Sequence, residues 1–383
     1  MIIYGAGKRG QRLYEKCRNS KTKIDGFIDK RANDIDKSIF CEDVKILTIN
    51  EAIAQGWQEK TVIISPVVCD DIVCELQNLG FQDIICLNDV IHDLIEWSPY
   101  YTYYVPVKDE EGDFRNAVPF NHYESPYADL ALIRRNRNQI YNINKEMNIN
   151  FYIESQINLL NQMSEIPLLK WGKKEEDNGF RYYTDNTWFG FSCAAALYGM
   201  IMLKKPKHII EIGSGFSTSV MLDTNEHCFN NEIGIECIEP RPQRLKELLK
   251  EGDRIIIHEK DLQEMSLDLF SKLEQNDILF IDSSHIMKTG SDVSYELFEI
   301  LPRLPKGVYI HFHDVYWPFE YPMDWVTGGC AYNEQYVLRA LLTDSTAYKV
   351  TLFGHQLICL SNAGIIPNIN PIYGGDSIWI EKL

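Results

Sequence analysis

Apolar and polar positions alternate in blocks along the second half of the chain. Short apolar runs at 208–212, 233–238, 254–258, 277–281 and 308–312 are typical of strands buried in a parallel sheet. Helical patterns lie around and between them, at 191–203, 242–250, 292–301 and 334–342. This order predicts a doubly wound α/β sheet with helices on both faces.

The last part of the chain departs from this alternation. Two apolar runs, 348–353 and 356–360, are separated only by Gly354 and His355. We expect them to form an antiparallel hairpin that closes the sheet, whereas a dinucleotide-binding fold usually ends on a parallel strand.

A smaller α/β unit is predicted at the N-terminus. Its expected strands are 1–4, 23–28, 61–68 and 83–87, and its expected helices are 11–19 and 70–79. Tyrosine and asparagine are frequent in the region that follows, where 128–165 has weak helical periodicity. We therefore divide the chain into a small Rossmann-like domain (1–94), a largely helical connecting and substrate-covering region (95–187) and a larger α/β domain (188–383).

The composition restricts the ligands more than the fold. The formal net charge is −17, which argues against nucleic acid or an anionic membrane as partner, because both bind basic surfaces. No apolar run approaches the roughly 20 residues that span a bilayer, and the first residues are too few for a secretion signal. The ten cysteines fit no common zinc motif. We expect a cytoplasmic protein with reduced thiols.

A glycine-containing loop follows the first strand of the larger domain. Its order is Glu211, Gly213, Gly215 and then the hydroxyl residue Ser217. The glycines let backbone N–H groups approach a ligand closely. This order resembles motif I of class I S-adenosylmethionine-dependent methyltransferases, in which an acid precedes the loop. The resemblance implies S-adenosylmethionine as cofactor.

Two further acids follow the next strands. Glu239 ends the second strand, at the sheet edge where ligands bind, and its carboxylate could accept hydrogen bonds from both ribose hydroxyls. Asp261 follows the third strand, a position that commonly contacts the adenine amino group in methyltransferases. Either acid alone could equally be a helix cap.

A second group of polar residues lies at the ends of the fourth and fifth strands, which should converge. A neutral His285 is a suitable general base for methyl transfer to a hydroxyl. Asp282, His313 and Asp314 offer two carboxylates and an imidazole, a set that could hold Mg²⁺ or Mn²⁺. The alternative is that the histidines of the fifth strand are satisfied strand residues and no metal binds.

The spacing of these residues resembles that of metal-dependent sugar O-methyltransferases of macrolide biosynthesis. In that family an Asp and a following acidic pair hold Mg²⁺, and a His three residues after the Asp is the base. The chain has His313 where the family has an acid. The resemblance implies His285 as base and leaves the metal open.

A wider resemblance covers residues 95–361. The stretch from Arg181 through Asn186 to the Glu211 loop, and the stretch from His313 to Pro322, are similar to methyltransferases of bacterial surface-polysaccharide and natural-product clusters. This similarity implies a sugar or other small-molecule acceptor. The aromatic residues after Asp314 would form either an acceptor wall or a packed loop under the C-terminal hairpin.

The N-terminal unit carries its own glycine loop. Gly5, Gly7 and Gly10 form a G-x-G-x-x-G between a strand and a helix, and Asp29 lies where a ribose-binding acid would. The unit resembles the nucleotide-sugar-binding domain of bacterial sugar acyltransferases. It would bind a nucleotide-linked sugar, or serve oligomerisation, as in a homodimer, or partner docking.

The sequence therefore predicts a methyltransferase that acts on a hydroxyl of a sugar or other small molecule, with nucleotide- or lipid-linked acceptors included. Two alternatives remain at this point. One is an NAD-dependent oxidoreductase that uses the N-terminal loop. The other is a non-catalytic nucleotide-sugar-binding scaffold.

Overall fold

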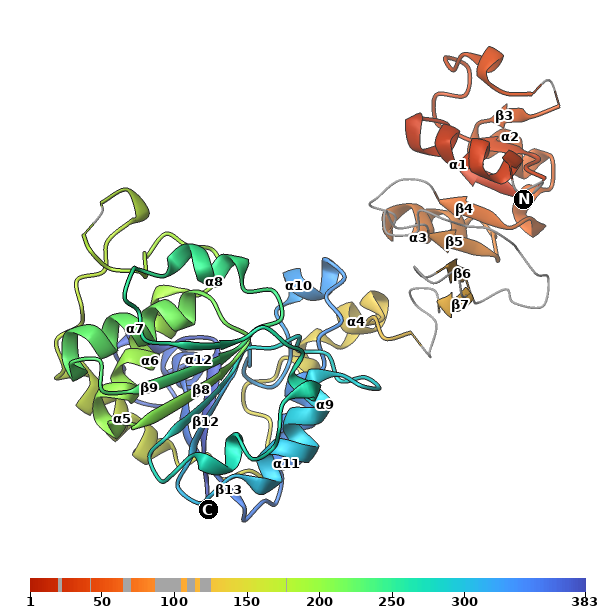
Figure 1. The fold of residues 1–383 in the computed structure, drawn as a ribbon. Coiled ribbons are helices and arrows are strands. Elements are labelled where there is room, and N and C mark those ends of the chain that lie inside the picture. The colour runs from red at the N-terminus through yellow and green to blue at the C-terminus, as the bar shows by residue number, and fades with distance from the viewer. Residues whose placement is uncertain are drawn as a thin grey trace. The chain divides into compact units, whose positions relative to one another are not determined.

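The chain folds into two compact units, Met1–Ile133 and Arg134–Leu383. The computed structural model describes residues 1–19, 23–41, 43–64, 70–86, 105–108, 114–117, 125–176 and 178–383. Each unit has its own sheet and core (Figure 1). The predicted boundary at residue 94 lies outside the described residues, and 134–187 belong to the same unit as the larger α/β domain.

The first unit is built on a five-stranded sheet in the order β3-β2-β1-β4-β5, with all pairs parallel. This is the strand order of the doubly wound dinucleotide-binding fold as far as its fifth strand. The elements are β1 (Ile2–Tyr4), α1 (Lys8–Asn19), β2 (Gly26–Ile28), β3 (Lys45–Leu47), α2 (Ile49–Ala54), β4 (Val62–Ile64), α3 (Asp70–Asn78) and β5 (Ile84–Cys86). An antiparallel pair follows, β6 (Val105–Lys108) and β7 (Phe114–Ala117).

Sequence patterns missed β3, because three residues are too few for a period of two to stand out, and they also missed the six-residue helix α2. The predicted strand 61–68 is observed over Val62–Ile64, and residues 65–68 lie outside the described residues.

The second unit is built on a seven-stranded sheet in the order β10-β9-β8-β11-β12-β14-β13. Its elements are α4 (Leu130–Ile140), which spans the boundary between the units, α5 (Ile153–Ser164), α6 (Phe191–Lys204), β8 (His208–Ile212), α7 (Phe216–Phe229), β9 (Gly234–Ile238), α8 (Gln243–Leu248), β10 (Ile256–His258), β11 (Ile278–Ile281), α9 (Asp292–Tyr295), β12 (Tyr309–His313), α10 (Met323–Thr327), α11 (Glu334–Leu342), β13 (Tyr348–Phe353), α12 (Gly354–Asn362) and β14 (Ser377–Lys382). A π-helical turn, Glu296–Ile300, follows α9.

Side chains of the central strands alternate between two cores. Ile209, Ile278 and Phe280 pack with α6 and α7 on one face, whereas Ile210 and Leu279 pack against the other face with α11. Figure 1 shows these helices on opposite sides of the sheet. Because both faces are covered, the parallel strands read as continuous apolar runs. The predicted fold class, a doubly wound α/β sheet closed by antiparallel strands, is confirmed.

The predicted partner of the closing strand is wrong. Residues 356–360 belong to helix α12, and β13 pairs instead with β14 at the end of the chain. A short apolar run does not distinguish a strand from a buried helix. The buried positions of α12, among them Gln356, Leu357 and Leu360, follow helical spacing. Strand β12, which is parallel to β11, pairs antiparallel with β14 on its other side.

Candidate active site

A cavity of about 740 Å³ opens at the carboxyl ends of β8, β9, β11 and β12. This is the edge at which open α/β sheets bind ligands. Its lining comes from the segment 186–193, the 213–217 loop and the ends of three further strands. The predicted residues that line it are Gly213, Gly215, Ser217, Glu239, Asp282, His285, His313 and Asp314.

Gly213 sits where no other residue fits. Its φ is +77°, and a Cβ atom there would lie 1.8 Å from the carbonyl oxygen of Asp282. The Gly213 N–H donates to the oxygen of Ile238, and the Asp282 N–H donates to that of Ile212. The first turn of the loop is therefore clamped between neighbouring strands, and its next residues face the cavity.

Glu211 lies beneath the loop and is fully buried. Ser217 Oγ donates to Glu211 Oε1 at 2.6 Å, and Thr218 Oγ1 and Cys237 Sγ donate to Oε2. Burial raises the pKa of Glu211 to about 7, although these hydrogen bonds act to lower it. Glu211 does not line the cavity. In this geometry it supports the loop from below.

Glu239 and Asp261, the two acids expected at the cofactor, differ in position. Glu239 lines the cavity, where Oε2 accepts from Ser214 N at 3.1 Å and Oε1 accepts from Arg241 N at 2.8 Å. Asp261 is exposed, precedes the short 3₁₀ turn at 262–264 and does not line the cavity. The structure thus brings Glu239 to the ligand space and leaves Asp261 outside it.

His285 stands at the centre of a cluster of acids. Its Nε2 lies 3.3 Å from Asp282 Oδ1 and 3.5 Å from Asp314 Oδ2, and its Nδ1 lies 2.8 Å from Glu334 Oε2. Burial lowers the pKa of His285, but the hydrogen bonds with Asp282 and Glu334 outweigh it and raise the pKa to about 10. The ring is therefore a cation at neutral pH in this geometry.

His313 faces the same two aspartates. Its Nδ1 lies 3.5 Å from Asp282 Oδ1 and 3.3 Å from Asp314 Oδ1. Although burial opposes it, the charge of Asp282 raises the pKa of His313 well above its usual range. Burial raises the pKa of Asp282, but the neighbouring histidines lower it to about 2. The cluster is a compact alternation of carboxylates and imidazoles.

The residues do not fit a metal as they stand. Among the described residues no group of three or more His, Cys, Asp or Glu side chains is placed to hold a metal ion. Both imidazoles point their nitrogens at the oxygens a cation would need. The predicted Mg²⁺ or Mn²⁺ at Asp282, His313 and Asp314 is not part of this arrangement and stays a prediction.

The aromatic residues after Asp314 divide between the two expected roles. Tyr316, Trp325 and Tyr332 line the cavity. Trp317 and Phe319 are instead buried against Phe151 in the core. Residues Met323–Thr327 form α10, which begins directly after Pro322.

Three comparisons place the chain among known proteins. Residues 210–315 match the family model described as a methyltransferase domain. An uncharacterized protein of Archaeoglobus fulgidus is 30% identical over 166 residues, which are 41% of this chain and 74% of that protein. The chain belongs to the family of this archaeal protein. The stretch 210–315 that matches the methyltransferase-domain model includes most of β8, all of β9 to β12, and most of the cavity cluster.

Solved structures give distant likenesses. The methyltransferase PaMTH1 of Podospora anserina, bound to SAH, is 14% identical, with 67% of this chain and 97% of that chain covered and a TM-score of 0.34. The structure described as cmcI-D160 Mg-SAM is 15% identical, with 58% and 84% covered and a TM-score of 0.31. Both TM-scores are below 0.5, so neither structure decides a ligand for this chain.

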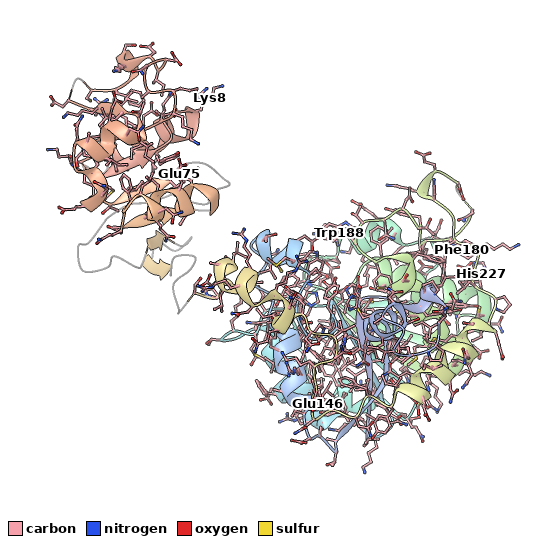
Figure 2. All side chains as sticks on the ribbon, turned by 180° about the vertical axis from the view of Figure 1, so that it is seen from behind. Lys8, Glu75, Glu146, Phe180, Trp188 and His227 are labelled. Carbon is pink, nitrogen blue, oxygen red and sulfur yellow. The ribbon has the colours of Figure 1, made fainter. Side chains whose placement is uncertain are left out.

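Sequence patterns assigned no role at the site to Trp188, Asn186 or Glu334. Trp188 lines the cavity and is 63% exposed (Figure 2). The Arg244 guanidinium lies 3.7 Å from the centre of its ring. Asn186 Oδ1 accepts from the N–H groups of Trp188 and Phe189, which fixes this turn. For Glu334 the sequence predicts only the start of a helix. Nothing local in the sequence distinguishes it from an ordinary first-turn acid.

The glycine loop of the first unit, which begins at Gly5, is a separate candidate site. Gly5 has φ of +92°, and helix α1 begins at Lys8, so Gly10 lies in the helix and not in the loop. Asp29 is 8% exposed, and its carboxylate accepts from the N–H groups of Ala6 and Arg31 at 2.8 Å each. Asp29 therefore braces the loop. Its role toward a ribose stays a prediction.

No helix in the described part of the chain is long and apolar enough to cross a membrane.

Proposed function

We propose that the protein transfers the methyl group of S-adenosylmethionine to a hydroxyl of a sugar or other small molecule, in surface-polysaccharide or natural-product biosynthesis. The observation that supports this most is the composition of one cavity. Its lining contains the Gly213–Gly215 loop with Glu239 and also the His285 cluster. A cofactor at the loop and an acceptor at the cluster would share this space.

The loop half of the cavity suits a nucleoside without phosphates. Glu239 is half-buried and fixed by two backbone N–H groups, so its remaining lone pairs can accept hydrogen bonds from ribose hydroxyls. Of the described residues that line the cavity, one is a lysine or arginine: Arg244, which lies beside Gly215. A phosphate-binding loop more often has the pattern G-x-G-x-x-G or ends in Gly-Lys-Ser, and the loop at Gly213 has neither.

The cluster half of the cavity suits proton removal from a hydroxyl. S-adenosylmethionine would supply the methyl group, with S-adenosylhomocysteine as the leaving group when the acceptor oxygen bonds to the methyl carbon. Nε2 of His285 would take the proton of the acceptor hydroxyl. A base must be neutral, so the reacting form is the one in which His285 has given up the proton it shares with Asp282 and Asp314. These aspartates would then orient the acceptor hydroxyl.

The aromatic lining supports a sugar acceptor. Tyr316 and Trp325 lie 5.4 Å apart at a steep angle, and Tyr332 lies beside His285 with ring centres 4.9 Å apart. Such faces stack on the apolar face of a sugar ring and leave its hydroxyls to the carboxylates. We propose a nucleotide- or lipid-linked sugar, with the Gly5–Gly10 segment binding a nucleotide-linked sugar in its own unit.

The first experiment is calorimetric titration with S-adenosylhomocysteine. We expect micromolar binding to the wild type and about tenfold weaker binding to Glu239→Gln, because the charged acceptor is lost. Glu236→Gln is a matched control on the same strand, since Glu236 pairs with His258 at 3.0 Å and does not line the cavity. Absence of binding at millimolar ligand would contradict the proposal, and titration of the Gly5 loop with NAD would follow.

The acceptor is then sought among nucleotide sugars by mass spectrometry of methylated products. His285→Ala should abolish turnover and keep S-adenosylhomocysteine binding. If no acceptor reacts and a cellular phenotype survives His285→Ala, the non-catalytic scaffold is favoured instead.

Chelator treatment tests the metal separately. The rings of His285 and His313 both place a nitrogen against Asp282 Oδ1, an oxygen that a metal ion would need. We therefore expect turnover to survive chelation. Loss of turnover in chelator, with recovery on adding Mg²⁺ or Mn²⁺, would establish the metal predicted at Asp282, His313 and Asp314.

A further inference from the structure

A buried carboxyl lies behind the cavity, on the side of His285 away from the ligand space. Glu334 is the first residue of α11, is 1% exposed and does not line the cavity. Its Oε2 lies 2.8 Å from Nδ1 of His285 across 49 residues of sequence. This is the shortest of the three distances between His285 and its acids.

The start of α11 also holds the backbone of His285. The N–H groups of Asn333 and Glu334 both donate to the His285 oxygen, at 3.0 and 3.2 Å. Asn333 Oδ1 accepts from Met287 N at 2.6 Å. His285 itself has φ of +59°, a conformation that a non-glycine residue keeps only where its surroundings enforce it. Ring and backbone of His285 are therefore fixed by the same helix end.

We propose that Glu334 is a positioning residue for His285. By accepting the Nδ1 proton it selects the ring orientation in which Nε2 faces the cavity, between Asp282 Oδ1 and Asp314 Oδ2. An acid that orients a histidine in this way fixes both its tautomer and its direction. The consequence for methyl transfer rests on the proposed function, whereas the ring orientation does not.

A second buried acid supports this assignment. Glu296 lies in the π-helical turn, is fully buried, and neither of its carboxyl oxygens has a hydrogen-bond partner among the described residues. Burial and the charge of Glu334 raise the pKa of Glu296 well above its usual range. Two neighbouring buried carboxyls do not both ionise. Burial also raises the pKa of Glu334, but its hydrogen bond with His285 lowers that pKa, so Glu334 is the acid of the two whose charge has a direct imidazole partner.

The competing explanation is that Glu334 only stabilises the start of α11, where a negative charge is favourable. That role would be lost in Glu334→Gln without any change at the ring of His285. A readout at the ring itself therefore distinguishes the two roles.

The experiment is nitrogen-15 NMR of histidine-labelled full-length protein at constant pH, with His285 assigned by His285→Gln. We expect a slowly exchanging Nδ1–H resonance for His285 in the wild type and its loss in Glu334→Gln. In the matched control Glu236→Gln, only the His258 signals should change. If the wild type lacks a protonated, hydrogen-bonded Nδ1, or if Glu334→Gln leaves this resonance in place, the proposal is overturned. Absence of this resonance from the wild-type spectrum overturns the proposal even if the variant does not fold.

Two further measurements separate this proposal from the proposed function. Glu334→Gln should bind S-adenosylhomocysteine like the wild type, because Glu334 does not line the cavity. With a methyl acceptor, its kcat should fall about 100-fold with little change in KM. A KM effect with unchanged kcat would overturn the positioning role, whereas failure of the wild type to bind S-adenosylhomocysteine would overturn only the methyltransferase assignment.

Discussion

Glu211 shows how a motif residue can act without touching the ligand. Its two oxygens accept hydrogen bonds from Ser217, Thr218 and Cys237, and Thr218 Oγ1 in turn accepts from the N–H of Gly215. The acid therefore connects β8, β9 and the start of α7 beneath the loop. Its contribution is to the shape of the loop, and burial is the source of its raised pKa.

Because the pKa of Glu211 is raised from 4.5 to about 7 by burial, the folded state binds a proton more tightly than the unfolded state. This contribution to stability is complete below pH 4.5 and is lost as the pH rises to about 7. We expect Glu211→Gln to remove up to about 3 kcal/mol of this pH dependence. Urea unfolding of both proteins across this range measures it, and identical pH profiles would contradict it.

Gly213 gives a second test at the scale of one residue. Gly213→Ala places a Cβ atom against the Asp282 carbonyl in addition to straining a positive φ. Gly252→Ala is the matched control, with φ of +92° and no atom within 4 Å of the added carbon. We expect about 1–2 kcal/mol of destabilisation from the strain alone in the control and clearly more in Gly213→Ala. Equal unfolding midpoints would show that the loop relaxes freely.

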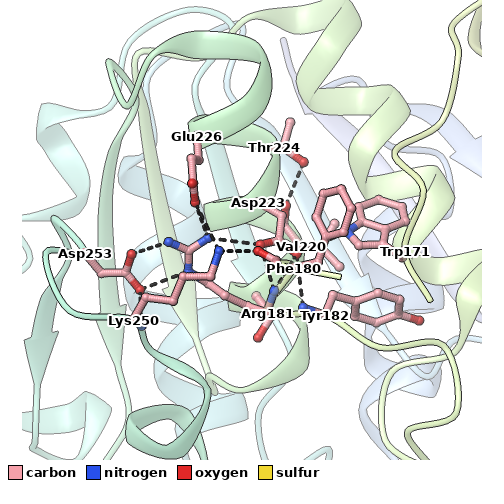
Figure 3. A network of polar contacts seen from close by, with 12 residues as sticks. Trp171, Phe180, Arg181, Tyr182, Val220, Asp223, Thr224, Glu226, Lys250 and Asp253 are labelled. Carbon is pink, nitrogen blue, oxygen red and sulfur yellow. Dashed lines mark hydrogen bonds and ion pairs between the residues drawn. The ribbon is translucent and has the colours of Figure 1, made fainter. Parts of the chain in front are cut away.

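At the scale of elements, one buried arginine ties the segment before α6 to the sheet helices. Arg181 pairs with Asp223 and Glu226 of α7 and with Asp253 after α8 (Figure 3). Asp223 also accepts from Trp171 Nε1 and from the N–H groups of Arg181 and Tyr182. Phe180 packs beside His227 of α7 (Figure 2). This anchoring places the following turn, 186–190, at the cavity.

Breaking this network should be costly because its partners are buried. Arg181→Met leaves Asp223, with no side-chain exposure, without its cation, and we expect a loss of about 3–5 kcal/mol. The exposed pair of Lys207 and Glu274 is the control, where Glu274→Gln should change little. Denaturant unfolding compares the two variants, and a small effect of Arg181→Met would show that the segment is held by its aromatic packing instead.

At the scale of the whole molecule, the chain divides its chemistry between two units. All residues that line the cavity lie between 186 and 376, in the unit Arg134–Leu383. The glycine loop at Gly5 belongs to the other unit, whose parallel sheet has its own core. Each unit therefore contains the residues of its own candidate site.

This division predicts that the larger unit binds the cofactor by itself. A fragment of residues 125–383, which keeps α4 whole, should bind S-adenosylhomocysteine with the dissociation constant of the full chain. Calorimetry on both proteins measures this. Loss of binding in a folded fragment would show that residues 1–124 contribute to the site.

The sequence by itself determined the kinds of elements and most of their positions. Apolar runs and helical periods follow from local burial, and Gly213 is required by a backbone conformation that glycine readily adopts. The strand-end rule also brought Glu239, Asp282, His285 and Asp314 to one cavity.

Only the tertiary structure decided which of these side chains face a ligand and which proton each carries. Glu211 is turned into the core, Asp261 lies outside the cavity, and Glu334 reaches His285 from a helix 49 residues away. The raised pKa of His285 depends on Asp282 and on Glu334, two acids from separate segments of the chain. Contacts between distant residues and the loss of solvent around them arise only on folding, so no local pattern contains them.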